Sequence, residues 1–399
     1  MSFTRSPNLQ FLEASQTVAI SNEAKRRQAA GEDVIDLGVG EPDFDTPTAV
    51  AESGIAAIRA GHTRYAPNIG IAPLREAMAG ALSRMSGGRT VDPARILVSN
   101  GSKQSLFNAC FALFGPGDEV LIPSPAWVSY PQIVHLARAT PVAVAGDPEW
   151  GLKVSVDDLE RHRTPATRGL ILCSPSNPTG AVYSAPEVRA IAEWAARHGI
   201  WLLSDEIYRR IHYGAGPAPS ILDLEDGLLE RTVVIYGASK AYAMTGWRIG
   251  AAYAPAPLHQ AMAALQSHTT TGANHPAMHA AATAFSDPAV DAEVDRMVAA
   301  FRRRRDYLVA RFTEQAPGVE FVEPHGAFYL FFRVEGVMGM RGAGGLAFCE
   351  RVMQEEGLAL VPGGAFGDDR WVRLSYSVSD ADLERATDRL LACIGRLDG

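Results

Sequence analysis

The sequence contains few cysteines, no long apolar segment and no excess of positive charge. Its four cysteines lie far apart with no C-x-x-C pair, which indicates neither a disulfide framework nor a zinc site and fits a reducing compartment best. No apolar run approaches the ~18–20 residues needed to cross a bilayer, and the first residues, MSFTRSPNLQFLEAS, lack the apolar core of a signal peptide. The net charge of −8 offers no basic field for nucleic acid. We therefore expect a cytoplasmic protein without a membrane or nucleic-acid partner.

The composition is that of a globular protein, with 47% hydrophobic and 21% charged residues. A chain of 399 residues is too long for one simple core, so we expect two lobes. The run FRRRRDY at residues 301–307 is a local exception to the acidic balance. It lies in a helix-like segment with acids upstream, and we interpret it as a solvated helix face.

Short apolar runs alternate with helical patterns through the middle of the chain. RILVS, EVLIP, GLILC, GIWLLSD and TVVIYG each predict a buried strand, and segments such as APEVRAIAEWAARHG between them predict amphipathic helices. Buried strands that alternate with helices are typical of an α/β domain with a mostly parallel, doubly wound sheet. We expect this large domain to cover residues 46–290.

The pattern changes near Asp287. A long helical stretch, AEVDRMVAAFRRRRDYLVARF, precedes the alternating segments AFYLFFRV and RWVRLSYS and a final helix. These features predict a smaller α+β domain at residues 291–399, to which the N-terminal segment 1–45 is also assigned from chain order.

Polar residues follow several of the predicted strands. Asn177, Asp205, Tyr208 and Lys240 all come at such exits, and ligands of open α/β sheets bind at the carboxyl ends of the strands. A carboxylate directly after a buried strand is costly unless it is paired. Asp205 therefore either caps a following helix or holds a protonated ring nitrogen of a ligand.

Small residues and two cations suggest an anion site beside a reactive amine. Gly101 and Ser102 open a helix, whose free N–H groups and dipole favour phosphate, and Arg248 would complete the cradle. Lys240 stands among small and apolar residues, which lowers an amine's pKa and makes it a nucleophile toward carbonyl compounds. The alternative for Lys240 is a surface lysine whose stem alone is buried.

The segment GASKAYAMTGWRIG resembles the lysine segment of class-I pyridoxal-phosphate aminotransferases. That pattern places small and apolar residues before the lysine and an arginine eight residues later, as Lys240 and Arg248 are placed here. GEPDFDTP, TRYAP, SPAWVSYP, SPSNPTGAVY, SDEIY, GAFYLF and VRLSYS resemble further family motifs in the same order. The resemblance covers nearly the whole chain, is greatest to bacterial aspartate aminotransferases, and implies the fold type I architecture.

The resemblance implies a role for each matching residue. Lys240 would form the Schiff base with pyridoxal 5′-phosphate and later move the substrate proton, with Asp205 and Tyr208 as the other catalytic residues. Cofactor binding would involve the pyridine-nitrogen partner Asp205, the partners of the ring 3-oxygen Asn177 and Tyr208, the stacking Trp127, and the phosphate ligands Ser102, Lys103, Ser239 and Arg248. Substrate binding would involve Gly40, Trp127, Asn177, Lys103, Thr17 and Arg373, which clamps the α-carboxylate. Tyr65 would reach the phosphate of a neighbouring subunit, which implies a homodimer with shared active sites.

Only a few residues indicate which substrate the enzyme uses. Lys103 and Thr17 match positions that bacterial aspartate aminotransferases share, which favours L-aspartate with 2-oxoglutarate, giving oxaloacetate and L-glutamate by ping-pong transamination. Lys103 could instead be a solvated residue at a helix start. Gly272–His275 and Ala126 depart from the family pattern, so an aromatic or broad-specificity aminotransferase stays open.

Parts of the sequence also suit other functions. A β-lyase or oxidase on the same scaffold would keep Lys240, Asp205 and Arg373. GASKA is a poor match to the G-x-S-x-G elbow of serine hydrolases because its last residue is alanine. GVGEPD lacks the third glycine of a dinucleotide-binding loop. A binding module without a cofactor is the remaining alternative.

Overall fold

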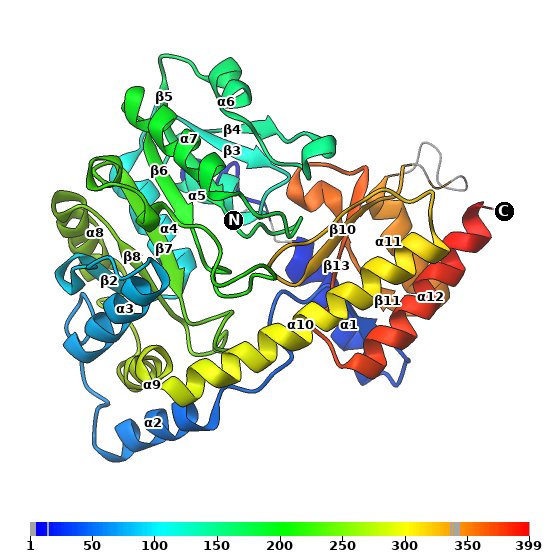
Figure 1. The fold of residues 1–399 in the computed structure, drawn as a ribbon, viewed down its shortest axis with the longest axis horizontal. Coiled ribbons are helices and arrows are strands. Elements are labelled where there is room, and N and C mark those ends of the chain that lie inside the picture. The colour runs from blue at the N-terminus through cyan, green and yellow to red at the C-terminus, as the bar shows by residue number, and fades with distance from the viewer. Residues whose placement is uncertain (1–4, 14–15, 336, 338–343, 399) are drawn as a thin grey trace.

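The computed structural model describes residues 5–13, 16–335, 337 and 344–398. Its largest element is a seven-stranded sheet with the strand order β2-β8-β7-β6-β5-β3-β4 (Figure 1). All these strands are parallel except β8, which runs antiparallel to β2 and β7. The expected mostly parallel α/β sheet is confirmed. The strands are β2 (Ile96–Asn100), β3 (Glu119–Ser124), β4 (Thr140–Ala145), β5 (Thr167–Cys173), β6 (Trp201–Asp205), β7 (Thr232–Gly237) and β8 (Ile249–Tyr253).

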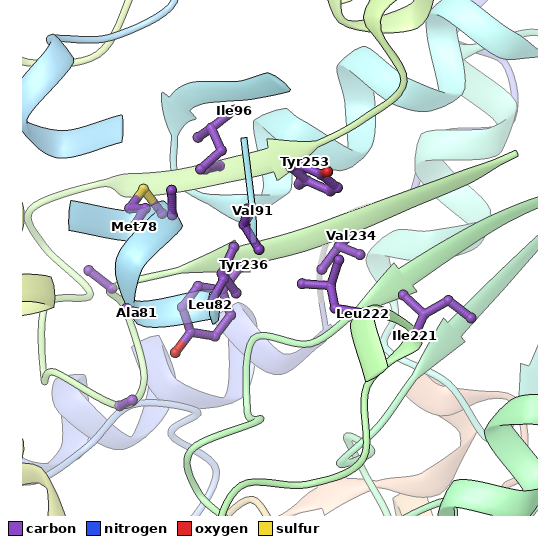
Figure 2. Close-up of a cluster of buried hydrophobic side chains, with 14 of the residues drawn as sticks. Met78, Ala81, Leu82, Val91, Ile96, Ile221, Leu222, Val234, Tyr236 and Tyr253 are labelled. Atoms are coloured by element: carbon purple, nitrogen blue, oxygen red, sulfur yellow. The ribbon is translucent and has the colours of Figure 1, made fainter. Parts of the chain in front are cut away.

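Helices cover both faces of this sheet because successive strand residues point to opposite sides. On β7, Val233 and Ile235 pack with one buried cluster, whereas Val234 and Tyr236 pack with the other. Figure 2 shows part of the second cluster, in which Met78 and Leu82 come from the helix Ala72–Met85 and Val234 and Tyr236 come from β7. That face carries α3 (Ala72–Met85), α7 (Ala185–Arg197) and α9 (His275–Ser286), and the opposite face carries α4 (Ser102–Leu113), α5 (Ser129–Leu136) and α8 (Ala256–Thr269).

The helix α7 shows how local sequence sets these elements. Ser184 and Glu187 form a reciprocal capping box at its start, where the Ser184 hydroxyl accepts from the Glu187 N–H and the Glu187 carboxylate accepts from the Ser184 N–H. Val188, Ile191 and Ala195 lie buried at helical spacing. Gly199 follows the helix with φ 65°, a left-handed conformation typical of glycine after a helix.

A second group of elements contains the C-terminal end of the described chain and the first α-helix, α1. A four-stranded sheet has the order β12-β13-β10-β9, and β1 pairs in parallel with β11, which joins the N-terminal segment to the C-terminal part. The strands are β1 (Ile35–Asp36), β9 (Phe321–Val322), β10 (Tyr329–Arg333), β11 (Leu358–Ala359), β12 (Val361–Pro362) and β13 (Trp371–Ser375). The helices around them are α1 (Gln16–Ala29), α10 (Pro288–Gln315), α11 (Gly345–Glu356) and α12 (Asp380–Asp398).

The remaining elements are short or lie at the periphery. The helix α2 (Thr48–Arg59) packs on α9, and α6 (Val156–His162) packs on α7. The short 3₁₀ helices are Pro7–Leu9, Pro93–Arg95, Pro148–Trp150, Ile221–Asp223, Asp226–Leu229 and Gly363–Phe366. Among the described residues, none of the helices combines the length and the apolar character that a membrane span requires.

The arginine run on α10 differs from the expected solvated face. Arg302 and Arg303 are exposed, but Arg304 is only 8% exposed and pairs with two carboxylates. Its Nη1 donates to Asp43 at 2.8 Å and its Nε donates to Asp380 at 2.6 Å. The expectation was wrong for Arg304 because its acidic partners lie far away in sequence, in the N-terminal segment and at the start of α12.

Candidate active site

The strand exits and the second group of elements enclose a cavity of about 440 Å³. Twelve of the thirteen predicted site residues line it, and Tyr65 does not. The twelve are Thr17, Gly40, Ser102, Lys103, Trp127, Asn177, Asp205, Tyr208, Ser239, Lys240, Arg248 and Arg373. The polar residues after separate strands therefore converge on one site, as expected for carboxyl ends of parallel strands.

Asp205 ends β6 and is buried at the cavity wall. The Tyr130 hydroxyl donates to its Oδ2 at 2.8 Å, and the Ile207 N–H donates to its Oδ1 at 3.3 Å. Burial is the main influence and raises the pKa of Asp205 to about 6. Among the described residues, no helix begins directly after Asp205, so the interpretation of Asp205 as a helix cap was wrong. A buried carboxylate with this pKa is suited to a cationic ring nitrogen.

Lys240 follows β7 and presents its amine to the cavity. The Nζ donates to the Gly40 carbonyl, which belongs to the loop after β1. Desolvation, with smaller effects of the nearby Arg373 and Arg248, lowers the pKa of Lys240 to about 8. An appreciable fraction of the amine is therefore neutral, and thus nucleophilic, near neutral pH.

The start of α4 and Arg248 form a cradle for an anion, and residues larger than glycine would fill it. Gly101 has φ 80° and caps α4, and a Cβ there would lie 2.5 Å from Nη2 of Arg248. A Cβ on Gly250 would lie 2.2 Å from the backbone nitrogen of Ser102. Both glycines thus let strand β8 and its arginine approach the helix start. The guanidinium is held by donation from Nη1 to the Thr245 carbonyl at 3.0 Å, beside N–H groups suited to a phosphate.

Arg373 of β13 approaches the cavity from the side opposite the large sheet. It is 2% exposed, its Nη1 donates to Asn177 Oδ1 at 3.0 Å, and its Nη2 donates to the Gly38 carbonyl at 2.6 Å. Its Nε is buried with no hydrogen-bond partner among the described residues. The guanidinium also lies 4.4 Å from the centre of the Tyr329 ring. A buried guanidinium with unused donor capacity is suited to a carboxylate ligand.

Two further contacts complete the polar lining. The Tyr208 and Tyr329 hydroxyls are 2.8 Å apart, and burial raises the pKa of Tyr208 well above its ordinary value. Lys103, the second residue of α4, lies with Nζ 4.8 Å from the centre of the Trp127 ring. Thr17 of α1 lines the same cavity. The lysine amine and the tryptophan ring therefore stand together on one wall.

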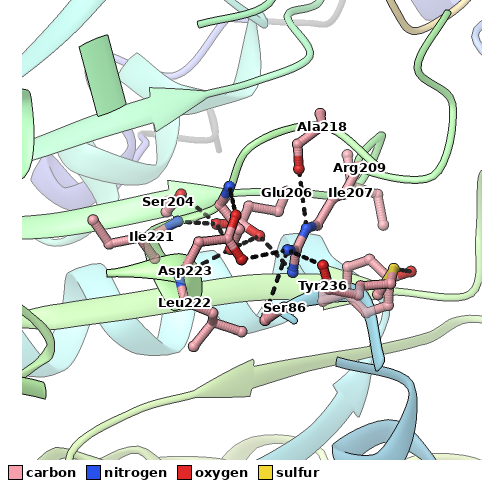
Figure 3. Close-up of polar contacts among 12 residues, drawn as sticks. Ser86, Ser204, Glu206, Ile207, Arg209, Ala218, Ile221, Leu222, Asp223 and Tyr236 are labelled. Carbon is pink, nitrogen blue, oxygen red and sulfur yellow. Dashed lines mark hydrogen bonds and ion pairs between the residues drawn. The ribbon is translucent and has the colours of Figure 1, made fainter. Parts of the chain in front are cut away.

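A buried polar network fixes the turn that follows Asp205 (Figure 3). Glu206 points away from the cavity and accepts from the Ser220 hydroxyl at 2.6 Å and from the Ser204 hydroxyl at 3.0 Å. Arg209 is fully buried and donates to Asp223 at 3.0 Å. Since this network holds both ends of the turn, it orients Asp205 and Tyr208 toward the cavity.

Twelve residues of the cavity lining were absent from the sequence-based prediction, among them Tyr130, Tyr329 and Glu41. Of these three, the two tyrosines bond directly to predicted site residues. Each of the three stands inside a motif that the prediction used, namely SPAWVSYP, GAFYLF and GEPDFDTP. A signal therefore existed for the segments, but which tyrosine faces the site depends on the three-dimensional packing.

The remaining predicted features lie outside the cavity lining. Tyr65 is 93% exposed, and the divergent segment Gly272–His275 precedes and begins α9. The Gly272 carbonyl accepts from Asn100 Nδ2 at 3.1 Å, and the Asn274 side chain accepts from the Ala277 N–H as the cap of α9. The segment thus has a structural role at the helix start.

The lining fits pyridoxal 5′-phosphate. The glycine-lined cradle beside Arg248 suits its phosphate, the buried Asp205 suits its ring nitrogen, and the amine of Lys240 suits its aldehyde carbon. The ring of Trp127 provides an aromatic wall.

Comparison with known proteins identifies a matching family and relatives of similar sequence. The model of the family "Aminotransferase class I and II" matches residues 32–390. The chain is 44% identical to a bifunctional aspartate aminotransferase and glutamate/aspartate-prephenate aminotransferase of Petunia hybrida, over 96% of this chain and 81% of that protein. It is 42% identical to an aspartate/prephenate aminotransferase of Cereibacter sphaeroides, over 98% of both chains.

A solved structure of similar fold is that of the aspartate aminotransferase from Thermus thermophilus with maleate. It has a TM-score of 0.92 and 38% identity, and the match covers 98% of this chain and 100% of that one. The chain therefore belongs to the class I and II aminotransferase family and is a pyridoxal-phosphate-dependent enzyme.

Proposed function

We propose that the enzyme transfers the amino group of L-aspartate to 2-oxoglutarate, giving oxaloacetate and L-glutamate. The observation that carries the proposal is the single cavity that holds the amine of Lys240, the carboxylate of Asp205 and the guanidinium of Arg373. The names of the relatives support aspartate as donor. The cationic Lys103 beside Trp127 supports a substrate with an acidic side chain.

The cofactor would be held by residues at the strand ends of the large sheet and at the start of α4. Lys240 would bond it, Asp205 would pair with its ring nitrogen, and Trp127 would cover its ring. Asn177 and Tyr208 would meet the 3-oxygen, and Ser102, Lys103 (through its N–H), Ser239 and Arg248 would surround the phosphate. When bound, pyridoxal 5′-phosphate supplies an electron sink that acidifies the Cα–H bond of an amino acid.

The chain's own residues then bind, orient and move a proton. Arg373 would hold the α-carboxylate through its donors, and Gly40 would leave room for it at the backbone. With a pKa of about 8, the Nζ of Lys240 is suited to take the proton from Cα and to return it. Asp205, buried and oriented by Tyr130, would keep its carboxylate on the ring nitrogen throughout.

A second substrate is favoured by the names of two relatives. Both the Petunia and the Cereibacter proteins are named for prephenate as well as aspartate. Prephenate is a 2-oxo acid with a second carboxylate, so the same pair of cations, Arg373 and Lys103, would meet it. We therefore include prephenate as an amino acceptor of this enzyme.

We also propose a cytoplasmic homodimer with shared active sites. Tyr65 is 93% exposed in one chain, which is unusual for a large aromatic residue and fits a role in a partner's phosphate site. The four cysteines are unpaired, which fits a reducing compartment. We divide each chain into residues 46–290 and a smaller domain of 291–399 with 1–45, supported by the β1–β11 pairing.

The first experiment is an absorbance spectrum of the cofactor-loaded enzyme before and after addition of L-aspartate without any 2-oxo acid. We expect the visible band to fall with aspartate and to return when 2-oxoglutarate is added. Lys240→Ala is the control and should show no such cycle. Equal amounts of oxaloacetate and glutamate support transamination, whereas release of ammonia would instead indicate a lyase or an oxidase. An unchanged band with aspartate and a response to other amino acids would contradict the proposed donor.

A further inference from the structure

Three histidines meet at the junction of α2 and α9, outside the cavity lining. His62 follows the end of α2, while His275 and His279 stand four residues apart on the first turns of α9. One ring nitrogen of each lies within 4.8 Å of the others. The ring centres are 4.2 Å apart for His62 and His279, and 5.0 Å apart for His62 and His275.

Two of the three histidines have a ring nitrogen that is available to a ligand. The Nδ1 of His275 lies 3.2 Å from the Arg64 carbonyl, to which it can only donate, so its Nε2 keeps a free lone pair. In a metal-binding histidine, the ring nitrogen that does not bind the metal commonly donates to a carbonyl. The Nε2 of His279 is buried with no hydrogen-bond partner among the described residues. An unpartnered buried nitrogen is costly unless something else binds it.

The chemistry of the three rings also suits a metal ion. Three imidazoles this close repel as cations, and the neutral ring is the form that coordinates a metal. Histidines at positions i and i+4 share one helix face, as in known zinc-binding helices.

We propose that His62, His275 and His279 form a binding site for a divalent transition metal, with Zn²⁺ as the preferred ion. Three neutral nitrogen donors suit Zn²⁺, Co²⁺ or Ni²⁺, whereas Mg²⁺ and Ca²⁺ require oxygen ligands. A water would complete a tetrahedron around the ion. At Zn–N distances of about 2.0–2.1 Å, the ring nitrogens, which now lie within 4.8 Å of one another, would move closer together when the ion binds.

The site would join two segments that are distant in sequence. It ties the chain after α2 to the first turn of α9, and α2 and α9 already pack side by side. The loop that His62 begins leads through Arg64 to Tyr65. None of the three histidines lines the cavity, so the metal would be structural, and the inference stands independently of the proposed function.

The test is a titration of the cofactor-loaded, metal-stripped enzyme with Zn²⁺ against a competing chromophoric chelator. We expect one tight site per chain. His275→Gln, His279→Asn and His62→Gln should each weaken it at least about tenfold, and the control His268→Gln, an exposed histidine at the end of α8, should leave it unchanged. Equal affinity in all four variants, or no tight site in the parent enzyme, would overturn the proposal and leave only a stack of imidazoles.

A second measurement separates metal binding from misfolding. Excess Zn²⁺ should raise the Tm of the parent enzyme and of His268→Gln, because a ligand that binds only the folded state stabilises it. The Tm of His275→Gln should not respond. Its turnover without metal should equal that of the parent enzyme, which shows that the variant is folded. Co²⁺ should give visible absorption typical of a tetrahedral nitrogen site in the parent enzyme and in His268→Gln, but not in His275→Gln.

Discussion

Asp205 couples the chemistry of the site to the stability of the protein without cofactor. Its folded-state pKa of about 6 is above the ordinary value of 3.8, so the folded chain holds the proton more tightly than the unfolded chain. The contribution to stability is complete below about pH 4 and is lost as the pH rises through about 6. At most roughly 3 kcal/mol is involved, since one pKa unit corresponds to about 1.4 kcal/mol.

The variant Asp205→Asn tests this coupling. We expect the free energy of unfolding of the cofactor-free parent enzyme to fall between pH 4 and pH 6 relative to that of Asp205→Asn. Urea unfolding at several pH values measures the difference. A constant difference across this range would show that Asp205 titrates normally.

Lys103 carries the argument for an acidic substrate. Lys103→Ala should lower kcat/KM for L-aspartate about 10- to 100-fold, because a charge-assisted contact contributes about 1.5–3 kcal/mol. The rate with L-phenylalanine should change little. Lys25→Ala is the matched control, since Lys25 is another lysine at the cavity lining. Steady-state kinetics with both donors measure this, and a loss confined to Lys25→Ala would transfer the role to that residue.

At the scale of elements, the start of α4 depends on one glycine. Gly101→Ala places a Cβ 2.5 Å from Arg248 at a positive φ, so either the arginine or the helix start must move. We expect the Kd of pyridoxal 5′-phosphate to rise at least about tenfold. Gly115→Ala is the control because open space surrounds that position. Fluorescence titration of both variants measures the Kd, and equal values would exclude the cradle as the phosphate site.

The elements differ in how readily the sequence reveals them. The strands β2, β3, β5, β6 and β7 are predicted by continuous apolar runs of β-forming residues. The strands β4 (TPVAVA) and β8 (IGAAY) were missed because small residues and proline weaken the pattern. Arg304 was misjudged for another reason, since its partners Asp43 and Asp380 come from distant segments. Residues within local motifs could thus be predicted, whereas long-range pairs could not.

The residues of the site also differ in whether the sequence predicts them. Lys240, Asp205 and Arg373 were predicted from motifs at strand ends, and they do line one cavity. Tyr130 was missed because its contact with Asp205 joins α5 to the end of β6, and no local pattern indicates which side of α5 faces the cavity. The cluster of His62, His275 and His279 was likewise not predicted, since His62 lies more than two hundred residues before the other two.

At the scale of the whole molecule, α10 connects the two groups of elements. It runs from beside α9 to beside α12 (Figure 1), and Arg304 on it binds Asp43 and Asp380. The N-terminal segment is therefore attached to the C-terminal elements by an ion pair as well as by the β1–β11 pair. This arrangement supports the proposed small domain of residues 1–45 and 291–399.

The proposed sharing of active sites between the two subunits of a dimer can be tested with a mixed dimer. If Tyr65 serves the partner's site, then Tyr65→Ala and Lys240→Ala homodimers are each impaired, but their mixed dimer contains one site with both residues intact. We expect the purified mixed dimer to recover about half of the parent activity. Tandem affinity tags isolate it, and light scattering gives its mass. A mixed dimer no more active than Tyr65→Ala would place Tyr65 in its own chain's site, and a monomer would exclude sharing.

The reversed strand β8 has a consequence for the geometry of the cofactor pocket. Parallel neighbours need a long crossover, but β7 and β8 form an antiparallel pair joined by residues 238–248. Lys240 and Arg248 thus belong to one hairpin loop that is closed by the bond from the Ala238 N–H to the Ile249 carbonyl. The loop length sets how far apart the backbones of Lys240 and Arg248 lie. A substitution that keeps the loop length leaves this spacing along the chain unchanged, whereas an inserted or deleted residue would mismatch it to the length of the cofactor.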